Sequence, residues 1–436
     1  MQRWSRASTF GAVEAIYATV VLFALTQGPV YRLWSESIAV GGEEEIPNAI
    51  HVHFASFILL QLPALLLIAR RATREWFSNN ALRSLLLLLG WLTVCAALST
   101  LARKSIPDVT ALLVTSLFGV YLARSFHARA LWLIVTSAMT AGVGISTFAA
   151  YRLWDGAVNL QQDYWIGIYF NRNSLAPVAA MALVGCLGVI ATWKWHNDVK
   201  SWLMGLLVVS AGFLGVQALV ESRSRTSVAA LAIAFGLVLA WLLPLMLSKR
   251  VVILARFSRW ILPVVVLLFS LALWANFQFI SGVAEFDREV TSFNSRGALW
   301  SHAWSGVLAR PVFGWGWLAA WHVRDFWDQG QWWSVWGEND WSHSGYFDML
   351  LGGGFPAAVL LMLFVLVAAM RLGVTSPIRL ATVRILLVGF VLAAATQESF
   401  FVGSHFMWAL LVAMLLFEPG PGFSLTSNTD NDVRHS

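Results

Sequence analysis

The sequence is poor in charge and in cysteine. Asp, Glu, Lys and Arg make up 12% of its 436 residues, half the ~25% that is usual in soluble globular proteins. This scarcity excludes a sizeable soluble domain, and the lack of a surface rich in Lys and Arg argues against a nucleic-acid-binding protein. The two cysteines, Cys95 and Cys186, both lie in apolar runs. They are predicted to be small buried side chains and say nothing about the redox compartment.

Long apolar runs take the place of the missing charge. Hydrophobic residues make up 58% of the chain, its mean hydropathy is +0.69, and many of its 24 tryptophans flank the apolar runs. About 20 apolar residues cross the hydrocarbon core of a bilayer, and tryptophan favours the membrane interface. We therefore predict an all-α polytopic membrane protein of about twelve transmembrane helices. The expected spans lie near residues 9–28, 50–69, 81–100, 108–125, 130–150, 174–193, 201–221, 227–247, 260–280, 345–370, 383–398 and 404–418.

The remaining charges are unevenly divided between the two sides of these spans. With the N-terminus inside, most of the 29 Lys and Arg residues fall in cytoplasmic segments, as the positive-inside rule requires. Both termini are therefore predicted to be cytoplasmic, and the first apolar run is expected to be a retained helix rather than a cleaved signal peptide. Residues 1–418 then form a single transmembrane domain, followed by a short tail at 419–436.

One connection is far longer than the others. Residues 281–344, between the ninth and tenth spans, form a large external loop, and loops of such length are usually functional or disordered. This loop is dense in Trp, Phe and Gly, which is not a disordered composition. Asn294 or Ser295 is the expected cap of an amphipathic helix that runs to Arg310. We expect that helix to lie on the membrane surface and to roof a cavity.

Several arginines stand on the outer side, where the orientation rule disfavours them. Arg172 precedes the sixth span, Arg223 and Arg225 lie in the turn between the seventh and eighth, and Arg296 opens the helix of the long loop. A guanidinium group binds two phosphate oxygens at once and stays charged. The cluster therefore suggests a site for a lipid-linked phosphate or pyrophosphate. The alternative is that each arginine merely reaches the lipid headgroups.

His343 ends the long loop directly before the tenth span. A neutral imidazole accepts a proton from a hydroxyl, which is general-base chemistry, although interfacial histidines without a catalytic role are common. Asp348 and Glu398 fall within or beside apolar runs, where charge is costly and indicates either function or pairing with an arginine. The acidic pairs in 285–287 and 338–340 have weak metal-ligand spacing and are read as solvated loop residues, so we expect no metal.

These residues together resemble the O-antigen ligase family, which is related to the O-antigen polymerases. The resemblance covers roughly residues 165–360 and rests on order and spacing. The family's most specific signature is a histidine, a small polar residue, nine free positions and a glycine, here His343, Ser344 and Gly354. Ala357 departs from the Gly, Thr or Tyr that the family often has. The other matching pieces are Asn171-Arg172-Asn173, Leu175-Ala176, Ser224-Arg225-Thr226, Ser295-Arg296 with Trp300, and Arg310-Pro311 with Gly314 and Gly316.

The resemblance implies an enzyme of the bacterial inner membrane whose active site faces the periplasm. Family members transfer a finished glycan from undecaprenyl pyrophosphate to a sugar hydroxyl of lipid A–core, with inversion and without a metal or nucleotide cofactor. On this basis His343 is the expected base, Arg225 and Arg296 bind the pyrophosphate, and Arg172 and Arg223 support them. The expected partners are the lipid-linked donor, the lipid A–core acceptor and membrane lipids.

Other functions remain open at this point. An O-antigen or exopolysaccharide polymerase uses the same donor and often has an arginine, ten free positions and a glycine. Arg225 and Gly236 fit this spacing, whereas Arg296 meets Val307 instead. A protein O-glycosyltransferase usually has a longer C-terminal region. A lipid or sugar transporter, or flippase, usually shows internal repeats and a substrate site near the bilayer midplane, and the sequence indicates neither.

Overall fold

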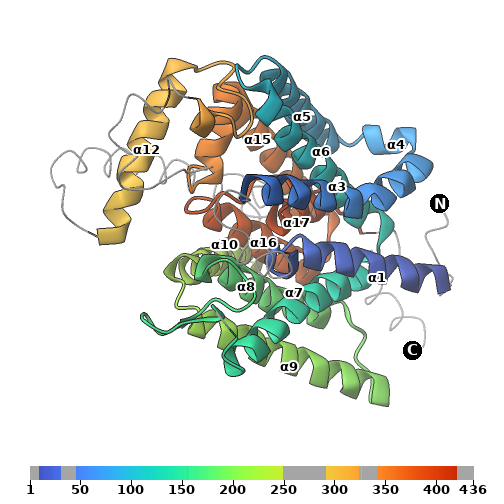
Figure 1. The fold of residues 1–436 in the computed structure, drawn as a ribbon. Coiled ribbons are helices and arrows are strands. Elements are labelled where there is room, and N and C mark those ends of the chain that lie inside the picture. The colour runs from blue at the N-terminus through green and yellow to red at the C-terminus, as the bar shows by residue number, and fades with distance from the viewer. Residues whose placement is uncertain are drawn as a thin grey trace.

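The computed structural model describes residues 9–30, 46–154, 156–248, 291–323, 326 and 341–419. This part of the chain is helical apart from one small β-hairpin (Figure 1). The hairpin consists of β1 (Val158–Asn159) and β2 (Tyr164–Trp165), which pair antiparallel. The helices are α1 (Thr9–Ala24), α3 (Ile46–Arg71), α4 (Arg74–Phe77), α5 (Asn80–Ala97), α6 (Ala102–Ser125), α7 (Ala128–Tyr151), α8 (Arg172–Thr192), α9 (Val199–Glu221), α10 (Arg225–Ser248), α12 (Thr291–Ala309), the 3₁₀ helix η2 (Ala320–His322), α15 (Gly345–Thr375), α16 (Ile378–Ala394) and α17 (Phe406–Leu416).

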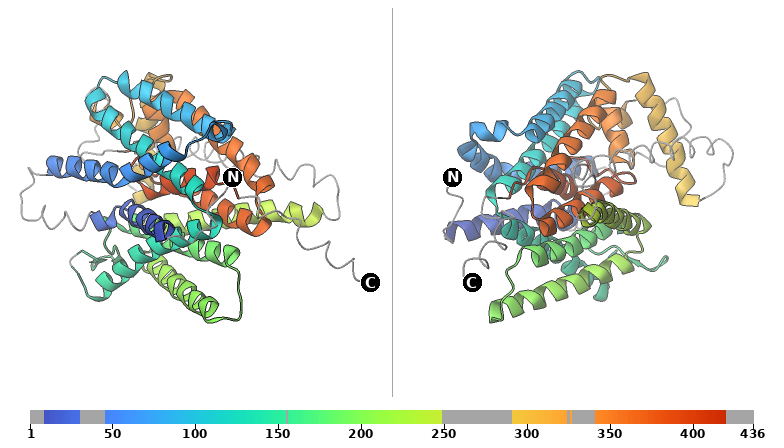
Figure 2. Two further views of the ribbon diagram at one scale, coloured as in Figure 1. Left: turned by 90° about the vertical axis from the view of Figure 1, so that its right-hand side faces the viewer. Right: turned by 180° about the vertical axis from the view of Figure 1, so that it is seen from behind.

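The all-helical membrane class is confirmed. Within the described residues, seven helices are long and apolar enough to cross a membrane: α5, α6, α7, α8, α9, α10 and α15. Helices also overlap the other expected spans, except that the ninth, at 260–280, lies outside the described residues. Figure 2 shows α9 at one edge of the helical body and α12 at the other. Apolar side chains of α9 such as Trp202, Leu206 and Phe213 are exposed, as suits a surface that faces lipid.

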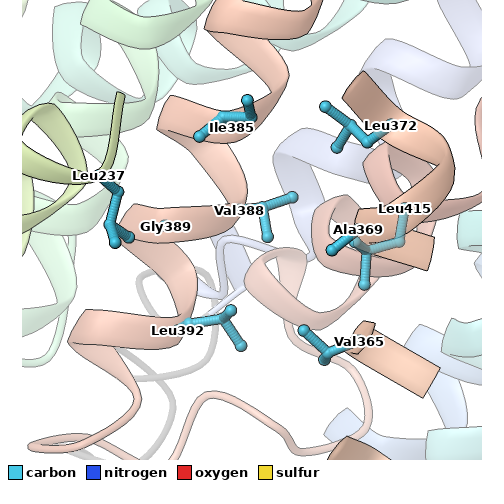
Figure 3. Close-up of a pocket in the computed structure, with 9 residues that line it drawn as sticks. All are labelled: Leu237, Val365, Ala369, Leu372, Ile385, Val388, Gly389, Leu392 and Leu415. Carbon is cyan, nitrogen blue, oxygen red and sulfur yellow. The ribbon is translucent and has the colours of Figure 1, made fainter. Parts of the chain in front are cut away.

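A narrow crevice lies between α10, α15, α16 and α17 (Figure 3). It has no polar side chain among its lining residues, so it offers no group that could move a proton or bind a phosphate. The polar residues described below lie at helix ends instead. The lining residues are Leu237, Val365, Ala369, Leu372, Ile385, Val388, Gly389, Leu392 and Leu415.

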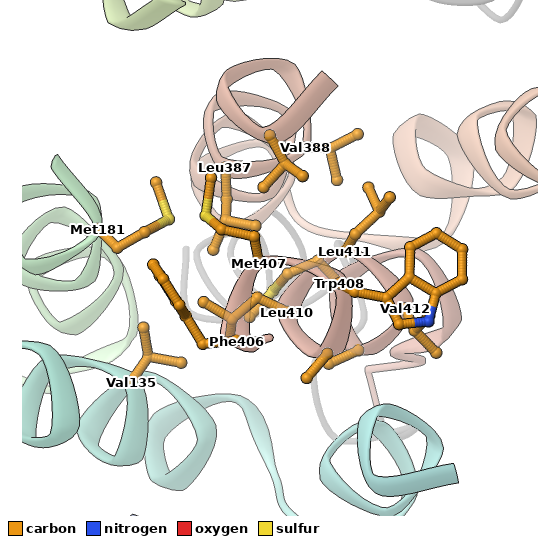
Figure 4. Close-up of a cluster of buried hydrophobic side chains, with 14 of the residues drawn as sticks. Val135, Met181, Leu387, Val388, Phe406, Met407, Trp408, Leu410, Leu411 and Val412 are labelled. Carbon is orange, nitrogen blue, oxygen red and sulfur yellow. The ribbon is translucent and has the colours of Figure 1, made fainter. Parts of the chain in front are cut away.

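Helix α17 lies in the centre of the molecule. All residues of Phe406–Leu416 are buried, and Val135, Met181 and Leu387 of three other helices point toward it (Figure 4). With 11 residues it is about 16 Å long, whereas the hydrocarbon core of a bilayer is about 30 Å thick. The span expected at 404–418 is therefore a shorter and buried helix, enclosed by its neighbours.

Helix α15 is broken by two glycines, and the loop after α12 docks at the break. Gly354 has φ +67° and ψ −168°, a region that is essentially restricted to glycine. The Phe355 N–H donates to the Pro311 carbonyl at 2.8 Å, and the Trp315 N–H donates to the Leu351 carbonyl at 2.7 Å. A Cβ on Gly354 would lie 2.2 Å from the Val312 carbonyl oxygen. The glycine of the sequence signature is thus required by backbone contact.

Helix α12 corresponds to the amphipathic helix expected in the long loop. It ends at Ala309, directly before the expected end at Arg310. The expected start was wrong, because Asn294 and Ser295 lie inside the helix and neither caps it. Leu299, Trp300 and Ala303 on α12 are buried against residues of α15 such as Phe347. The apolar face of α12 therefore packs on the helix that His343 precedes.

Candidate active site

His343 is held in a fixed loop at the start of α15. Its backbone has φ +53°, and its side chain is 26% exposed. On one side of it, the N–H and the hydroxyl of Ser342 both donate to Asp348 Oδ1, at 3.0 and 2.7 Å. The Trp300 indole N–H of α12 donates to the Ser342 carbonyl at 3.0 Å. Asp348 thus anchors the histidine loop, and its burial in an apolar run is explained by this structural role.

Glu398 faces His343 from the segment that follows α16. Glu398 Oε2 lies 3.7 Å from His343 Nδ1, and the carboxylate side chain is 14% exposed. The two segments are also joined through their backbones, because the Gly345 N–H donates to the carbonyls of Ala395 and Glu398 at 2.9 and 3.1 Å. A carboxylate at Nδ1 favours a proton on that nitrogen and leaves Nε2 as the acceptor. The imidazole is therefore oriented for general-base work.

The carboxylate of Glu398 connects the histidine to two distant turns. The Asn173 side-chain amide donates to Glu398 Oε1 at 2.9 Å, and the Ser224 hydroxyl donates to Asn173 Oδ1 at 2.9 Å. Asn173 lies in the first turn of α8, whose N-cap is Asn171. Ser224 directly precedes α10. The structure thus brings together the two turns that carry Arg172, Arg223 and Arg225 and joins them to the residue that faces His343.

The arginines on these turns differ in how they are held. The Arg172 guanidinium lies 4.8 Å from the centroid of the Tyr164 ring. Arg223 Nη2 lies 2.6 Å from Asp163 Oδ2, in a pair that is largely exposed. Arg225 is exposed and forms no ion pair with any residue that the structure describes. Of the three, Arg225 has the charge most available to an anionic ligand.

Arg296 lies in α12, but its side chain falls outside the described part of that helix. Its expected convergence with the other arginines therefore stays a prediction. His302, on the same helix, has an imidazole centroid 4.4 Å from that of Phe326. Burial lowers the pKa of His302, so this ring remains neutral and serves in packing.

The acidic pairs of the long loop, at 285–287 and 338–340, lie outside the described residues. Among the residues that the structure does describe, no three His, Cys, Asp or Glu side chains converge as a metal site would require. Among the described residues, the hydrogen-bonded series that leads away from His343 comprises a carboxylate, an amide and a hydroxyl. This set suits the movement of a proton at an imidazole beside a cationic surface.

The sequence alone did not assign three residues of this site, which are Asn173, Ser224 and Glu398. Asn173 belongs to the quoted Asn171–Asn173 motif and Ser224 to the Ser224–Thr226 motif, but neither was assigned a role. For Glu398 the sequence indicated either function or pairing with an arginine, whereas in the structure it faces His343 and accepts from Asn173. A signal was available, because a buried carboxylate needs hydrogen-bond donors, and these motifs supply polar side chains at span ends on the same side.

Comparison with known proteins relates one segment of the chain to a family. Residues 210–362 match the family model described as O-antigen ligase. The matched segment contains Arg223, Arg225, Arg296 and His343, whereas Asn173 and Glu398 lie outside it. No curated protein matches the chain. The family to which the sequence was compared is thus confirmed for the segment that carries most of the expected site.

Proposed function

We propose, on the premise that residues 210–362 belong to the O-antigen ligase family, that this membrane protein is a glycosyltransferase. It transfers a completed O-antigen glycan from undecaprenyl pyrophosphate to a sugar hydroxyl of lipid A–core. The reaction occurs at the periplasmic face of the bacterial inner membrane, without a metal, and both termini are cytoplasmic. His343 is the base, and the arginines bind the pyrophosphate.

The observation that carries this proposal is the position of the His343–Glu398 pair beside two arginine-bearing turns. His343 Nδ1 lies 3.7 Å from Glu398 Oε2, and Glu398 Oε1 is bonded through Asn173 to Ser224, the residue before Arg225. A base next to an available cation is what the transfer requires. The hydroxyl nucleophile must lose a proton while the leaving group gains negative charge.

The chemical step is a single displacement at the anomeric carbon. The acceptor oxygen forms a bond to that carbon as the bond from the carbon to the pyrophosphate oxygen breaks, so the configuration inverts. The hydroxyl proton passes to Nε2 of His343, and the electron pair of the broken bond leaves with the pyrophosphate. Glu398 stabilises the imidazolium that forms, because an opposite charge close to the ring favours its protonated state.

The arginines act on the leaving group. Arg225 and Arg296 neutralise the charge that develops on the pyrophosphate, and Arg172 and Arg223 support them from the neighbouring turns. Guanidinium groups suit this task because their planar donors match phosphate oxygens. Arg225 carries this argument best, since it is exposed and forms no ion pair with a described residue.

A polymerase is the second candidate. It uses the same donor chemistry and the same base, and differs only in taking a second lipid-linked glycan as the acceptor. The exposed arginine and the His343–Glu398 pair suit both reactions equally well, so the acceptor alone distinguishes them. A transporter or flippase needs neither a base nor an acceptor.

The test uses purified protein in lipid nanodiscs with labelled undecaprenyl-pyrophosphate glycan, first with lipid A–core and then without it. His343→Ala is compared with the wild type, and His196→Ala is the control because His196 is an exposed histidine in the loop between α8 and α9. We expect the wild type and His196→Ala to transfer the glycan to lipid A–core, and His343→Ala to transfer none while remaining folded.

Two outcomes would contradict the proposal. Extension of one lipid-linked glycan by another, with no transfer to lipid A–core, would make the protein a polymerase. Movement of the intact donor across the bilayer without cleavage of the pyrophosphate bond would make it a flippase.

A further inference from the structure

Asn173 is the only described side chain that bridges the Glu398 carboxylate and the turn before Arg225. We propose that Asn173 is a positioning residue, which sets the Glu398 carboxylate against His343 and, through Ser224, fixes the Arg225 turn relative to that pair. This inference rests on the proposed function, because it assigns the base and the pyrophosphate-binding arginine to one connected unit.

The hydrogen bonds of Asn173 determine the orientation of its amide. A carboxylate only accepts, so the NH₂ group must face Glu398 Oε1, at 2.9 Å, and the amide oxygen must face the Ser224 hydroxyl, also at 2.9 Å. An aspartate has the same shape but cannot donate to Glu398. Asn173 is therefore a residue for which the isosteric acid removes one function and leaves the fold of the turn in place.

The bond to Asn173 determines which carboxylate oxygen faces the histidine. Because Oε1 of Glu398 accepts from the amide, Oε2 is the oxygen directed at His343 Nδ1, 3.7 Å away. This separation is an ion-pair distance, and such contacts often shorten once substrate is bound. Without the amide, Oε1 of Glu398 loses this donor, so the carboxylate is held less firmly in the orientation that favours one tautomer of the imidazole.

Ser224 is equally well fixed on its own side. It is buried, and the Val228 N–H donates to its carbonyl at 3.3 Å, at the start of α10. Arg223 before it has φ +50°, a left-handed conformation that makes the turn sharp. The next residue is Arg225, the first of α10. The backbone that presents the Arg225 guanidinium is thus two hydrogen bonds away from Glu398.

This hydrogen-bonded connection links the two parts of the proposed site, the base that removes a proton and the arginine that binds the pyrophosphate. The base removes the acceptor proton while the arginine receives charge on the pyrophosphate, and both must hold their places within a fraction of an ångström. The base and the arginine come from segments that are far apart in the sequence, and the connection between them runs from Ser224 through Asn173 and Glu398 to His343. A hydrogen-bonded amide and hydroxyl join them without adding any charge.

The experiment compares Asn173→Asp, Ser224→Ala and Ser224→Thr with the wild type in nanodiscs. Ser174→Ala is the matched control, because the Ser174 hydroxyl bonds to Asn171 Oδ1 at 3.2 Å in the same turn and does not contact Glu398. Steady-state transfer gives kcat and the KM for the lipid-pyrophosphate donor. The tautomer of His343 is read from ¹⁵N-histidine NMR spectra and assigned by comparison with His343→Ala.

For Asn173→Asp we expect kcat to fall by about 10- to 100-fold, because a hydrogen bond to a charged group is lost, and donor KM to change less than about twofold. For Ser224→Ala we expect a fall in kcat of about threefold to tenfold, with a rise in KM, because the Arg225 turn loosens. Ser224→Thr restores the hydroxyl and most of the activity. The Nδ1–H tautomer dominates in the wild type and in Ser174→Ala, and it is lost in Asn173→Asp.

A kcat for Asn173→Asp close to that of the wild type, with the Nδ1–H tautomer retained, would overturn the inference. So would an equal loss in Ser174→Ala, since this would indicate a general disturbance of the turn. If the wild type transferred no glycan, the proposed function would fail. The tautomer of His343 in Asn173→Asp would still decide whether Asn173 positions Glu398.

Discussion

The bundle has one polar cluster at each end of α15, α16 and α17, and the two are built differently. Glu398 precedes α17 and belongs to the cluster around His343, here called the His343 end. Glu418 follows α17 and belongs to the other, here called the Glu418 end.

The Glu418 carboxylate accepts from Arg124 at 2.8 Å, from Arg371 at 3.1 Å and from Asn79 at 2.8 Å. Each of these donors comes from a different helix or loop.

A third arginine at the Glu418 end is held by backbone carbonyls. Arg384 is buried, and its guanidinium donates to the carbonyls of Met414 and Phe417 and to the Ser376 hydroxyl. It thereby satisfies carbonyls that the end of α17 leaves without helical partners. Nearby, Arg71 binds both carboxylate oxygens of Glu14, at 2.6 and 3.0 Å.

At the His343 end, the charged side chains are paired differently. Arg225 forms no ion pair with a described residue, and the Glu398 carboxylate approaches the imidazole without closing to a short hydrogen bond. The difference shows how one bundle divides its polar residues. The paired charges at the Glu418 end hold helices together, whereas Arg225 at the His343 end is available to the anionic donor of the proposed reaction. The same substitution should therefore have opposite effects at the two ends.

The largest expected effect comes from one substitution made at both ends. Glu398→Gln keeps the size of the side chain but removes the charge that faces His343. We expect kcat for transfer to fall by about 10²-fold or more, the scale of a general-base contribution, with little change in thermal stability.

Glu418→Gln weakens two arginine contacts, so it should lower the melting temperature and leave kcat unchanged. Steady-state transfer and thermal unfolding, measured on both variants in nanodiscs, test the comparison. A loss of activity in both, or in neither, would refute it.

The second prediction concerns the break in α15, where the loop after α12 docks. Gly354→Ala puts a side chain at φ +67° and a Cβ 2.2 Å from the Val312 carbonyl oxygen. We expect destabilisation of about 3 kcal/mol or more from backbone strain and overlap, seen as a lower melting temperature or as loss of folded protein.

Gly236→Ala is the matched control for this break. Gly236 lies inside α10, and a Cβ added there would have no neighbouring atom within 4 Å. Alanine favours a helix interior over glycine by about 1 kcal/mol, so this variant should be as stable as the wild type or slightly more so. Equal destabilisation by the two substitutions would show that the backbone at Gly354 has no special requirement.

The third prediction returns to the Glu418 end. Arg384→Met fills most of the arginine's volume but leaves the buried carbonyls of Met414 and Phe417 without their donor. An unsatisfied buried polar group costs about 1–3 kcal/mol, so the melting temperature should fall while kcat per folded molecule stays at the wild-type value. Arg384→Lys, which keeps a donor, should fall less. A loss of kcat in folded Arg384→Met would show that the Glu418 end also affects the reaction.

The sequence was sufficient for the helices, and it also supplied the candidate residues of the site. Runs of apolar residues determine where helices form, and the expected spans at 81–100 and 130–150 lie within a few residues of α5 and α7. His343 and Arg225 could be singled out because an imidazole suits proton transfer and a guanidinium suits phosphate, and because both residues stand in motifs of the family that the sequence resembles. A helix forms where the twelfth span was expected, but it is shorter than a span, and its burial in the centre depends on how the other helices enclose it.

What the sequence could not give is which polar residues meet. Glu398 and Asn173 are joined by a hydrogen bond of 2.9 Å across 225 positions of sequence, and no local pattern encodes a contact of that range. Asp348 was expected to indicate function or pairing with an arginine, and it bonds instead to Ser342, six residues away. The packing of helices decides the partner of Glu398, whereas the partner of Asp348 follows from the local turn at the start of α15.

The smallest expected effect separates the two arginines of one turn. Arg225→Ala should raise the donor KM by about tenfold, because a charge-assisted contact with phosphate is lost. Arg223→Ala should raise it by less than about threefold, since Arg223 is already paired with Asp163 at 2.6 Å and stands largely in solvent. Asp163→Asn releases Arg223 from this pair and should lower the donor KM slightly.

These differences are measured as donor KM values at low and at high salt, because exposed charges are screened. If Arg223→Ala had the larger effect, then the arginine that is paired in the structure would be the one that binds the donor. The contrast between an arginine that is paired with an acid and one that is available to the donor would then not hold within the His343 end.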